Sequence, residues 1–120
     1  MKVLITTSSF GDEGIQTLQK SGIEVVNNPY GRKITQTEAV SLLKGVDGVI
    51  AGLEQYDKDV LSRSELKVIS RCGSGFSNID LDAAKKLNIA VYSTPNGPTQ
   101  SVAELTIGCL LSLIRNVPHV

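Results

Sequence analysis

Short apolar runs alternate with amphipathic segments along most of the chain. The apolar runs are rich in Val, Ile, Leu and Ala and have the length of buried strands rather than of helices. They occupy residues 2–6, 23–26, 46–51, 67–70 and 89–92. Segments with helical spacing lie between them, at residues 12–20, 35–44, 57–63 and 81–87. This alternation predicts an α/β fold in which a five-stranded parallel sheet carries helices on both faces.

Local signals predict where these helices begin and end. Thr35 and Glu38 have the spacing of a capping box. Asp80 can cap the helix that follows it, and Gly22 can end the first helix. Right-handed crossovers would then bring the loops after the strands to one edge of the sheet, where ligands of such sheets bind.

The segment from Thr99 to Asn116 has a different pattern. Its middle, residues 105–114, is apolar on nearly every side, and Ser101 and Glu104 have capping-box spacing near its start. A helix that is apolar around its whole circumference needs cover on most sides. We therefore expect a long apolar helix here, covered by a further domain or by a second copy of the chain.

Composition narrows the class of protein. Apolar residues make up 41% of the 120 and charged residues 20%, as in a soluble globular domain. Twelve basic and twelve acidic residues cancel, which argues against a nucleic-acid or membrane partner. Cys72 and Cys109 are too few for a disulfide framework and lack metal-ligand spacing. A cytoplasmic protein without a metal site is expected.

The most distinctive stretch is residues 68–80, VISRCGSGFSNID. It has the pattern of a strand, a tight turn through Gly73, Ser74 and Gly75, and the start of a helix. The backbone N–H groups of such a turn can bind a small anion. Two other interpretations stay open: the turn only connects strand to helix, or it is part of a dinucleotide site. The second lacks its third glycine, because Asn78 stands at that position.

Other candidate chemistry is weaker. Residues 7–11 could hold a flavin phosphate, but this composition is common in turns. Asp80 and Asp82 fit helix capping better than a metal pair, and His119 has no carboxylate near it in sequence. Arg71 could face a ligand or solvate the end of its strand. No residue is assigned a catalytic role.

The chain resembles the N-terminal part of the D-isomer-specific 2-hydroxyacid dehydrogenases, most of all the phosphoglycerate-dehydrogenase branch. Residues 68–80 carry this resemblance first. It continues through DAA at 82–84, STPNG at 93–97 and VAELT at 102–106.

The resemblance implies a flavodoxin-like, doubly wound substrate-binding domain over residues 1–98 and a connecting and dimerisation helix over 99–120. In the family, a separate Rossmann domain binds NAD and carries the catalytic residues, and this chain has no counterpart of it. The resemblance thus implies a truncated NAD-dependent dehydrogenase that is inactive alone and forms a homodimer through Thr99 to Asn116. The alternative is a non-enzymatic acid-binding or regulatory dimerisation module.

The resemblance also assigns the substrate contacts. The carboxylate of a 2-hydroxy or 2-oxo acid would bind the backbone at Gly73, Ser74 and Gly75. The loop containing Gly52 and Leu53 would close over the substrate.

Two further assignments concern the cofactor and substrate charge. Ser74 and Val102 would lie near the nicotinamide of NAD. Glu54, beside the substrate loop, would repel a phosphate group, and that loop has no arginine to bind one.

Overall fold

A parallel sheet of five short strands forms the centre of the protein. The computed structural model describes residues 1–8 and 10–117. The strands are β1 (Lys2–Ile5), β2 (Glu24–Asn27), β3 (Gly48–Ala51), β4 (Val68–Arg71) and β5 (Ala90–Ser93). Their order is β2-β1-β3-β4-β5, and every neighbouring pair is parallel. The prediction of a five-stranded parallel sheet is confirmed, with the strand order of flavodoxin-type sheets.

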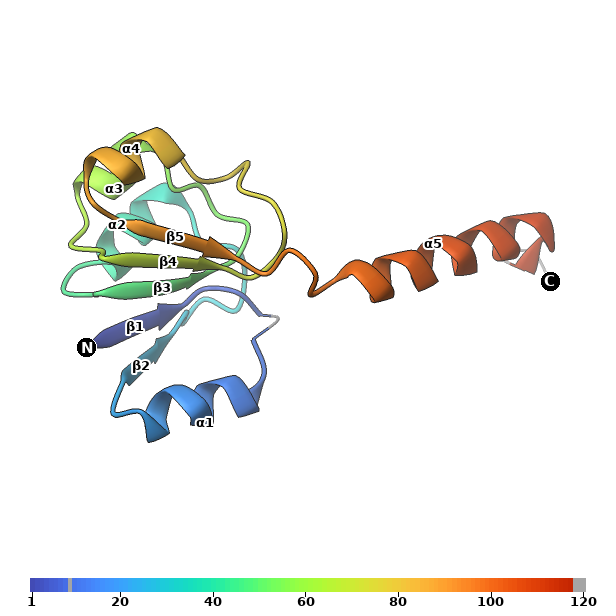
Figure 1. The fold of residues 1–120 in the computed structure, drawn as a ribbon, viewed down its shortest axis with the longest axis horizontal. Coiled ribbons are helices and arrows are strands. Elements are labelled where there is room, and N and C mark those ends of the chain that lie inside the picture. Colours follow the sequence, from blue (N-terminus) through green and yellow to red (C-terminus); the bar gives the residue numbers. More distant parts are fainter. Residues whose placement is uncertain (9, 118–120) are drawn as a thin grey trace.

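The helices lie on both sides of this sheet. They are α1 (Asp12–Lys20), α2 (Gln36–Leu42), α3 (Lys58–Ser62), α4 (Leu81–Lys86) and α5 (Thr99–Ile114). Figure 1 shows α1 on one side of the sheet, with α2, α3 and α4 on the other, while α5 extends away from it. The first four helices and the sheet, residues 1–98, are called the body below.

The hydrophobic core lies between the sheet and the helices α2, α3 and α4. Leu4, Val49 and Ile69 are neighbours across three strands, and none is more than 1% exposed. Small and branched residues of the three helices complete this cluster: Ala39, Val60, Leu61, Ala83 and Ala84. Parallel strands require cover on both faces, which explains their continuous apolar runs.

The opposite face of the sheet is covered unevenly. Val3 and Ile5 are buried there, on the strand next to the one that α1 contacts. Towards the other edge, Val68 is half-buried and its neighbour Ala90 is exposed. Tyr92, on the same face of β5 as Ala90, is 62% exposed.

The predicted caps of α2 and α4 are confirmed. The Thr35 hydroxyl accepts a hydrogen bond from the Glu38 N–H at 3.3 Å, and the Glu38 carboxylate accepts one from the Thr35 N–H at 2.8 Å. Asp80 accepts a hydrogen bond from the Ala83 N–H at 2.9 Å. Each bond satisfies an N–H group that has no partner inside its helix.

Helix α5 begins at Thr99, as expected for the segment Thr99 to Asn116, but without the capping box expected at Ser101. Pro98, not Ser101, occupies the N-cap position, and the Pro98 carbonyl accepts a hydrogen bond from the Val102 N–H at 2.9 Å. Glu104 accepts instead from the Gln100 side chain at 2.8 Å. The capping-box prediction at Ser101 was therefore wrong, because a proline can precede the first turn without losing a hydrogen bond.

The far end and the surface of α5 complete the description of the fold. The helix ends at Ile114, and none of its residues is buried. Among the residues that the structure describes, no helix combines the length and apolar character needed to cross a bilayer. His119 lies outside the described residues.

Candidate functional site

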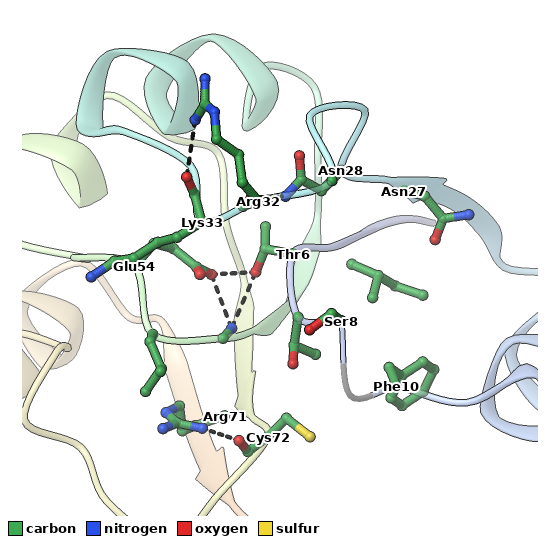
Figure 2. Close-up of a pocket in the computed structure, with 15 residues that line it drawn as sticks. Thr6, Ser8, Phe10, Asn27, Asn28, Arg32, Lys33, Glu54, Arg71 and Cys72 are labelled. Atoms are coloured by element: carbon green, nitrogen blue, oxygen red, sulfur yellow. Dashed lines mark hydrogen bonds between the residues drawn. The ribbon is translucent and has the colours of Figure 1, made fainter.

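A cleft of about 470 Å³ opens at the edge of the sheet where the strands end. Figure 2 shows its walls, which come from the loops after β1, β2 and β3 and from the end of β4. We call it the edge cleft. Its lining includes Thr6, Phe10, Asn28, Arg32, Lys33, Gly52, Leu53, Glu54, Arg71 and Cys72. This is the edge at which ligands of doubly wound sheets bind.

The glycine turn follows directly after this lining. Gly73 has a φ of 141°, in the region that favours glycine. Its N–H donates to the Thr94 hydroxyl at 2.9 Å, and its carbonyl accepts from the Thr94 N–H at 2.9 Å. The turn is thus tied to the loop after β5, and the amide of Gly73 is occupied.

The next two amides are different. Ser74 and Gly75 are exposed, and their N–H groups have no hydrogen-bond partner among the described residues. The turn is therefore open to solvent and presents two adjacent backbone donors. Such a pair is suited to an anion.

Arg71 lies beneath the turn. Its side chain is nearly buried, with the residue 9% exposed, and the guanidinium donates to the Cys72 carbonyl and to Asn78 Oδ1, the latter at 3.4 Å. None of the ion pairs among the described residues includes Arg71. Arg71 is thus largely shielded from bulk solvent, and its positive charge lies beside the glycine turn. This favours the interpretation that Arg71 faces a ligand.

The loop after β3 is held from inside. The buried Gly52 donates its N–H to Thr6 Oγ1 at 3.2 Å and to Glu54 Oε1 at 3.0 Å, so this amide already has partners within the fold. Leu53 is 65% exposed. Both residues line the edge cleft, Gly52 as buried backbone and Leu53 with an exposed side chain.

Glu54, which was predicted to repel a phosphate group beside the substrate loop, is held inside the fold. It is only 2% exposed, and its Oε1 atom also accepts hydrogen bonds from the Thr6 hydroxyl and, at 2.6 Å, from the Tyr56 hydroxyl. Figure 2 shows the Glu54 carboxylate turned towards Thr6. Its donors are Thr6, directly after β1, Gly52 in the same loop, and Tyr56. The expected repulsion of a phosphate group by Glu54 stays a prediction.

Tyr56 remains a neutral donor in this cluster. Burial raises its pKa well above the usual 10, and the neighbouring Glu54 carboxylate raises it further. The hydroxyl therefore keeps its proton for Glu54 over the whole physiological range.

Asn78 connects the glycine turn to the loop after β3. Its Nδ2 atom donates to the carbonyls of Gly52 at 3.1 Å and Glu54 at 2.7 Å, and its Oδ1 accepts from Arg71. The sequence pattern indicated only that Asn78 was not the third glycine of a dinucleotide motif. No local signal in the sequence reveals these distant partners.

The remaining predicted residues lie elsewhere. Val102 is in α5, is 57% exposed and does not line the edge cleft. Asp80 is used as a helix cap. Among the described residues, no group of three His, Cys, Asp or Glu side chains is arranged to hold a metal.

Comparison with known proteins gives consistent results. The profile of the D-isomer specific 2-hydroxyacid dehydrogenase, catalytic domain, matches residues 3–110. A D-3-phosphoglycerate dehydrogenase of Rattus norvegicus is 36% identical over 104 residues, which are 85% of this chain and 19% of that enzyme. One of Methanocaldococcus jannaschii is 34% identical over 122 residues, covering 99% of this chain and 22% of the enzyme.

A solved structure shares the fold as well. The NAD+-bound 3-phosphoglycerate dehydrogenase of Entamoeba histolytica superposes with a TM-score of 0.81 and 31% identity, covering 93% of this chain and 38% of the other. The chain thus spans about a fifth of the length of the curated relatives named above, 19% and 22%.

Proposed function

Because the chain belongs to the D-isomer specific 2-hydroxyacid dehydrogenase family, we propose that it is the substrate-binding part of such an enzyme. It takes the carboxylate of a 2-hydroxy or 2-oxo acid on the backbone N–H groups of Ser74 and Gly75. The observation that carries this proposal is that both amides are exposed and have no partner among the described residues.

The surroundings of the turn support an anion. The Arg71 guanidinium beneath it has no carboxylate in an ion pair, so its charge favours a bound acid. Gly73 orients the turn through its two hydrogen bonds to Thr94. Leu53, which lines the edge cleft beside Gly52, would cover the substrate once the carboxylate is bound.

This chain would contribute only a few contacts to the cofactor. The described residues do not offer a dinucleotide site of their own, since Asn78 fills the third-glycine position with a buried, fully engaged side chain. We propose that Ser74 and Val102 touch the nicotinamide of an NAD that is held outside this chain. Oxidation would pass a hydride from substrate C2 to that NAD and the hydroxyl proton to a base that, like the NAD, is supplied from outside this chain. The chain alone is expected to be inactive.

We further propose that α5 mediates dimerisation. Apolar side chains on several sides of this helix are more than half exposed: Val102, Leu105, Ile107, Leu110, Leu111, Leu113 and Ile114. Residues 99–116 of two copies would cover one another, and residues 1–98 would form the substrate-binding unit. The same exposure favours the alternative function, a non-enzymatic acid-binding module that acts through its dimer.

A titration followed by amide NMR tests the carboxylate site. Adding pyruvate should shift the Ser74 and Gly75 resonances most, with smaller shifts at Leu53. Methyl pyruvate, which lacks the negative charge, should leave those two resonances unchanged at the same concentration. Equal shifts with the ester, or shifts confined to other loops, would contradict the proposal.

The two functions differ in how binding and association are related. Sedimentation with and without pyruvate measures this directly. If pyruvate changes the dissociation constant of the dimer, the result supports the regulatory module. If pyruvate leaves that constant unchanged, the result supports the substrate-binding part of a dehydrogenase.

A further inference from the structure

The two oxygens of Glu54 have different surroundings. Oε1 accepts from the Thr6 hydroxyl, the Tyr56 hydroxyl and the Gly52 N–H. Oε2 has no hydrogen bond among the described residues. Among those residues, every polar side-chain atom that is fully shielded from solvent has a hydrogen-bond partner. Since Oε2 has no such partner, it must keep some contact with solvent, although Glu54 is only 2% exposed. Because Glu54 lines the edge cleft, that contact is with the cleft.

No basic side chain of the cleft forms an ion pair with this oxygen. Arg32 is paired with Glu38 at 2.7 Å, and Arg71 donates to Cys72 and Asn78. Lys33, the third basic residue of the lining, is exposed and makes no ion pair with Glu54. None of the ion pairs among the described residues includes Glu54. Because Oε2 meets solvent only through the cleft, a ligand that excludes water from this position must supply a donor in its place.

The position of Oε2 relates it to the carboxylate site. Glu54, Gly52 and Cys72 line the same cleft, and Cys72 immediately precedes the glycine turn. Gly73, Ser74 and Gly75 do not line the cleft themselves, so the side group of an acid held at Ser74 and Gly75 must extend past Cys72 to reach Glu54.

We propose that Glu54 Oε2 accepts a hydrogen bond from a hydroxyl or ammonium group on the substrate's side group and thereby sets substrate specificity. This inference rests on the proposed function. The hydrogen bond to Oε2 favours 2-hydroxy acids that carry a donor at C3 over those with an apolar C3. An acid with a phosphate at C3 is rejected, because the phosphate would face the carboxylate oxygen.

The Glu54→Gln variant tests this with little disturbance of the fold. Glutamine has the same shape, and its carbonyl oxygen can occupy the Oε1 position and accept from the same three donors. Its NH2 group then replaces Oε2 in the cleft, so an acceptor becomes a donor. Glu65→Gln is the matched control, since Glu65 is exposed and precedes β4, at the opposite edge of the sheet.

Binding of three probes by the 120-residue chain is measured by calorimetry or NMR titration. The wild type and Glu65→Gln should bind D-glycerate about tenfold more tightly than D-lactate, as expected for one hydrogen bond to a charged group. Glu54→Gln, with an unchanged far-ultraviolet spectrum, should bring that ratio close to one and bind 3-phosphoglycerate more tightly than the wild type does.

The outcomes separate the two proposals. If all three acids bind and Glu54→Gln leaves their ratios unchanged, the role of Glu54 is overturned while the carboxylate site stands. If none of the acids shifts the Ser74 and Gly75 amides, the carboxylate site and the role of Glu54 both fail.

Discussion

The body of the protein and helix α5 both contain apolar segments, but these differ completely in burial. Leu4 in β1 and Leu61 in α3 are at most 1% exposed, whereas Leu105 and Leu113 in α5 are 68% and 74% exposed. An apolar helical pattern therefore predicts a helix in both regions without saying what the helix packs against. An isolated helix of this length is marginal in water, so α5 depends on a partner in a way that α3 does not. The cost of a substitution should accordingly depend on burial.

Paired leucine truncations give the largest expected contrast. Leu4→Ala should lower the free energy of unfolding by about 3 kcal/mol, because it leaves a cavity among the buried side chains of the sheet. Leu110→Ala, at a position 56% exposed, should leave urea unfolding of the body unchanged and weaken self-association instead. Urea titration and sedimentation measure the two effects. Equal losses of stability in both variants would mean that α5 packs on the body.

Gly73 and Gly75 test, within a single turn, whether the cost of a substitution depends on the surroundings of the residue. Gly73 has a φ of 141°, which a residue with a Cβ rarely adopts, and a Cβ there would clash with the Arg71 guanidinium. Gly73→Ala should therefore cost about 2 kcal/mol and disturb the carboxylate site.

Gly75→Ala is the control for that substitution. A Cβ at Gly75 meets nothing within 4 Å, so the change should stay within about 0.5 kcal/mol. Its N–H remains, so pyruvate should still shift the amide of residue 75. Thermal unfolding of both variants checks the pair, and similar midpoints would show that the Gly73 turn is not constrained as described.

Two tyrosines extend the comparison to polar groups. Tyr56→Phe removes a buried hydroxyl that donates to Glu54 and should cost about 1–2 kcal/mol. Tyr92→Phe, at a position 62% exposed, should have no measurable effect on chemical unfolding. A loss in Tyr92→Phe as large as in Tyr56→Phe would indicate that another element covers β5.

Local signals predicted most of the body, and distant contacts explain what they missed. The caps at Thr35 and Asp80 depend on residues three positions away, so the sequence alone contains them. The cluster around Glu54 joins Thr6 to residues 48 and 50 positions later, and no local pattern reports such a pairing. The bond between Gly73 and Thr94 crosses 21 positions. The candidate site was thus predicted as a turn, but its supporting residues were not.

The smallest expected effect concerns an ion pair at the surface of the body. Hydrogen bonds from the Arg32 side chain and the Thr35 N–H lower the pKa of Glu38 from 4.5 to about 2. Since the folded-state pKa is the lower one, Glu38 stabilises the fold above pH 4.5, and this contribution is lost as the pH falls towards 2. Exposure and salt weaken it further.

Glu38→Gln keeps the capping-box geometry but removes the charge. The difference in stability between wild type and variant should therefore shrink from pH 6 to about pH 2 and decrease in 1 M salt, a concentration at which such pairs are screened. Urea unfolding across this range measures it, and a difference independent of pH would assign the effect of Glu38 to the cap alone.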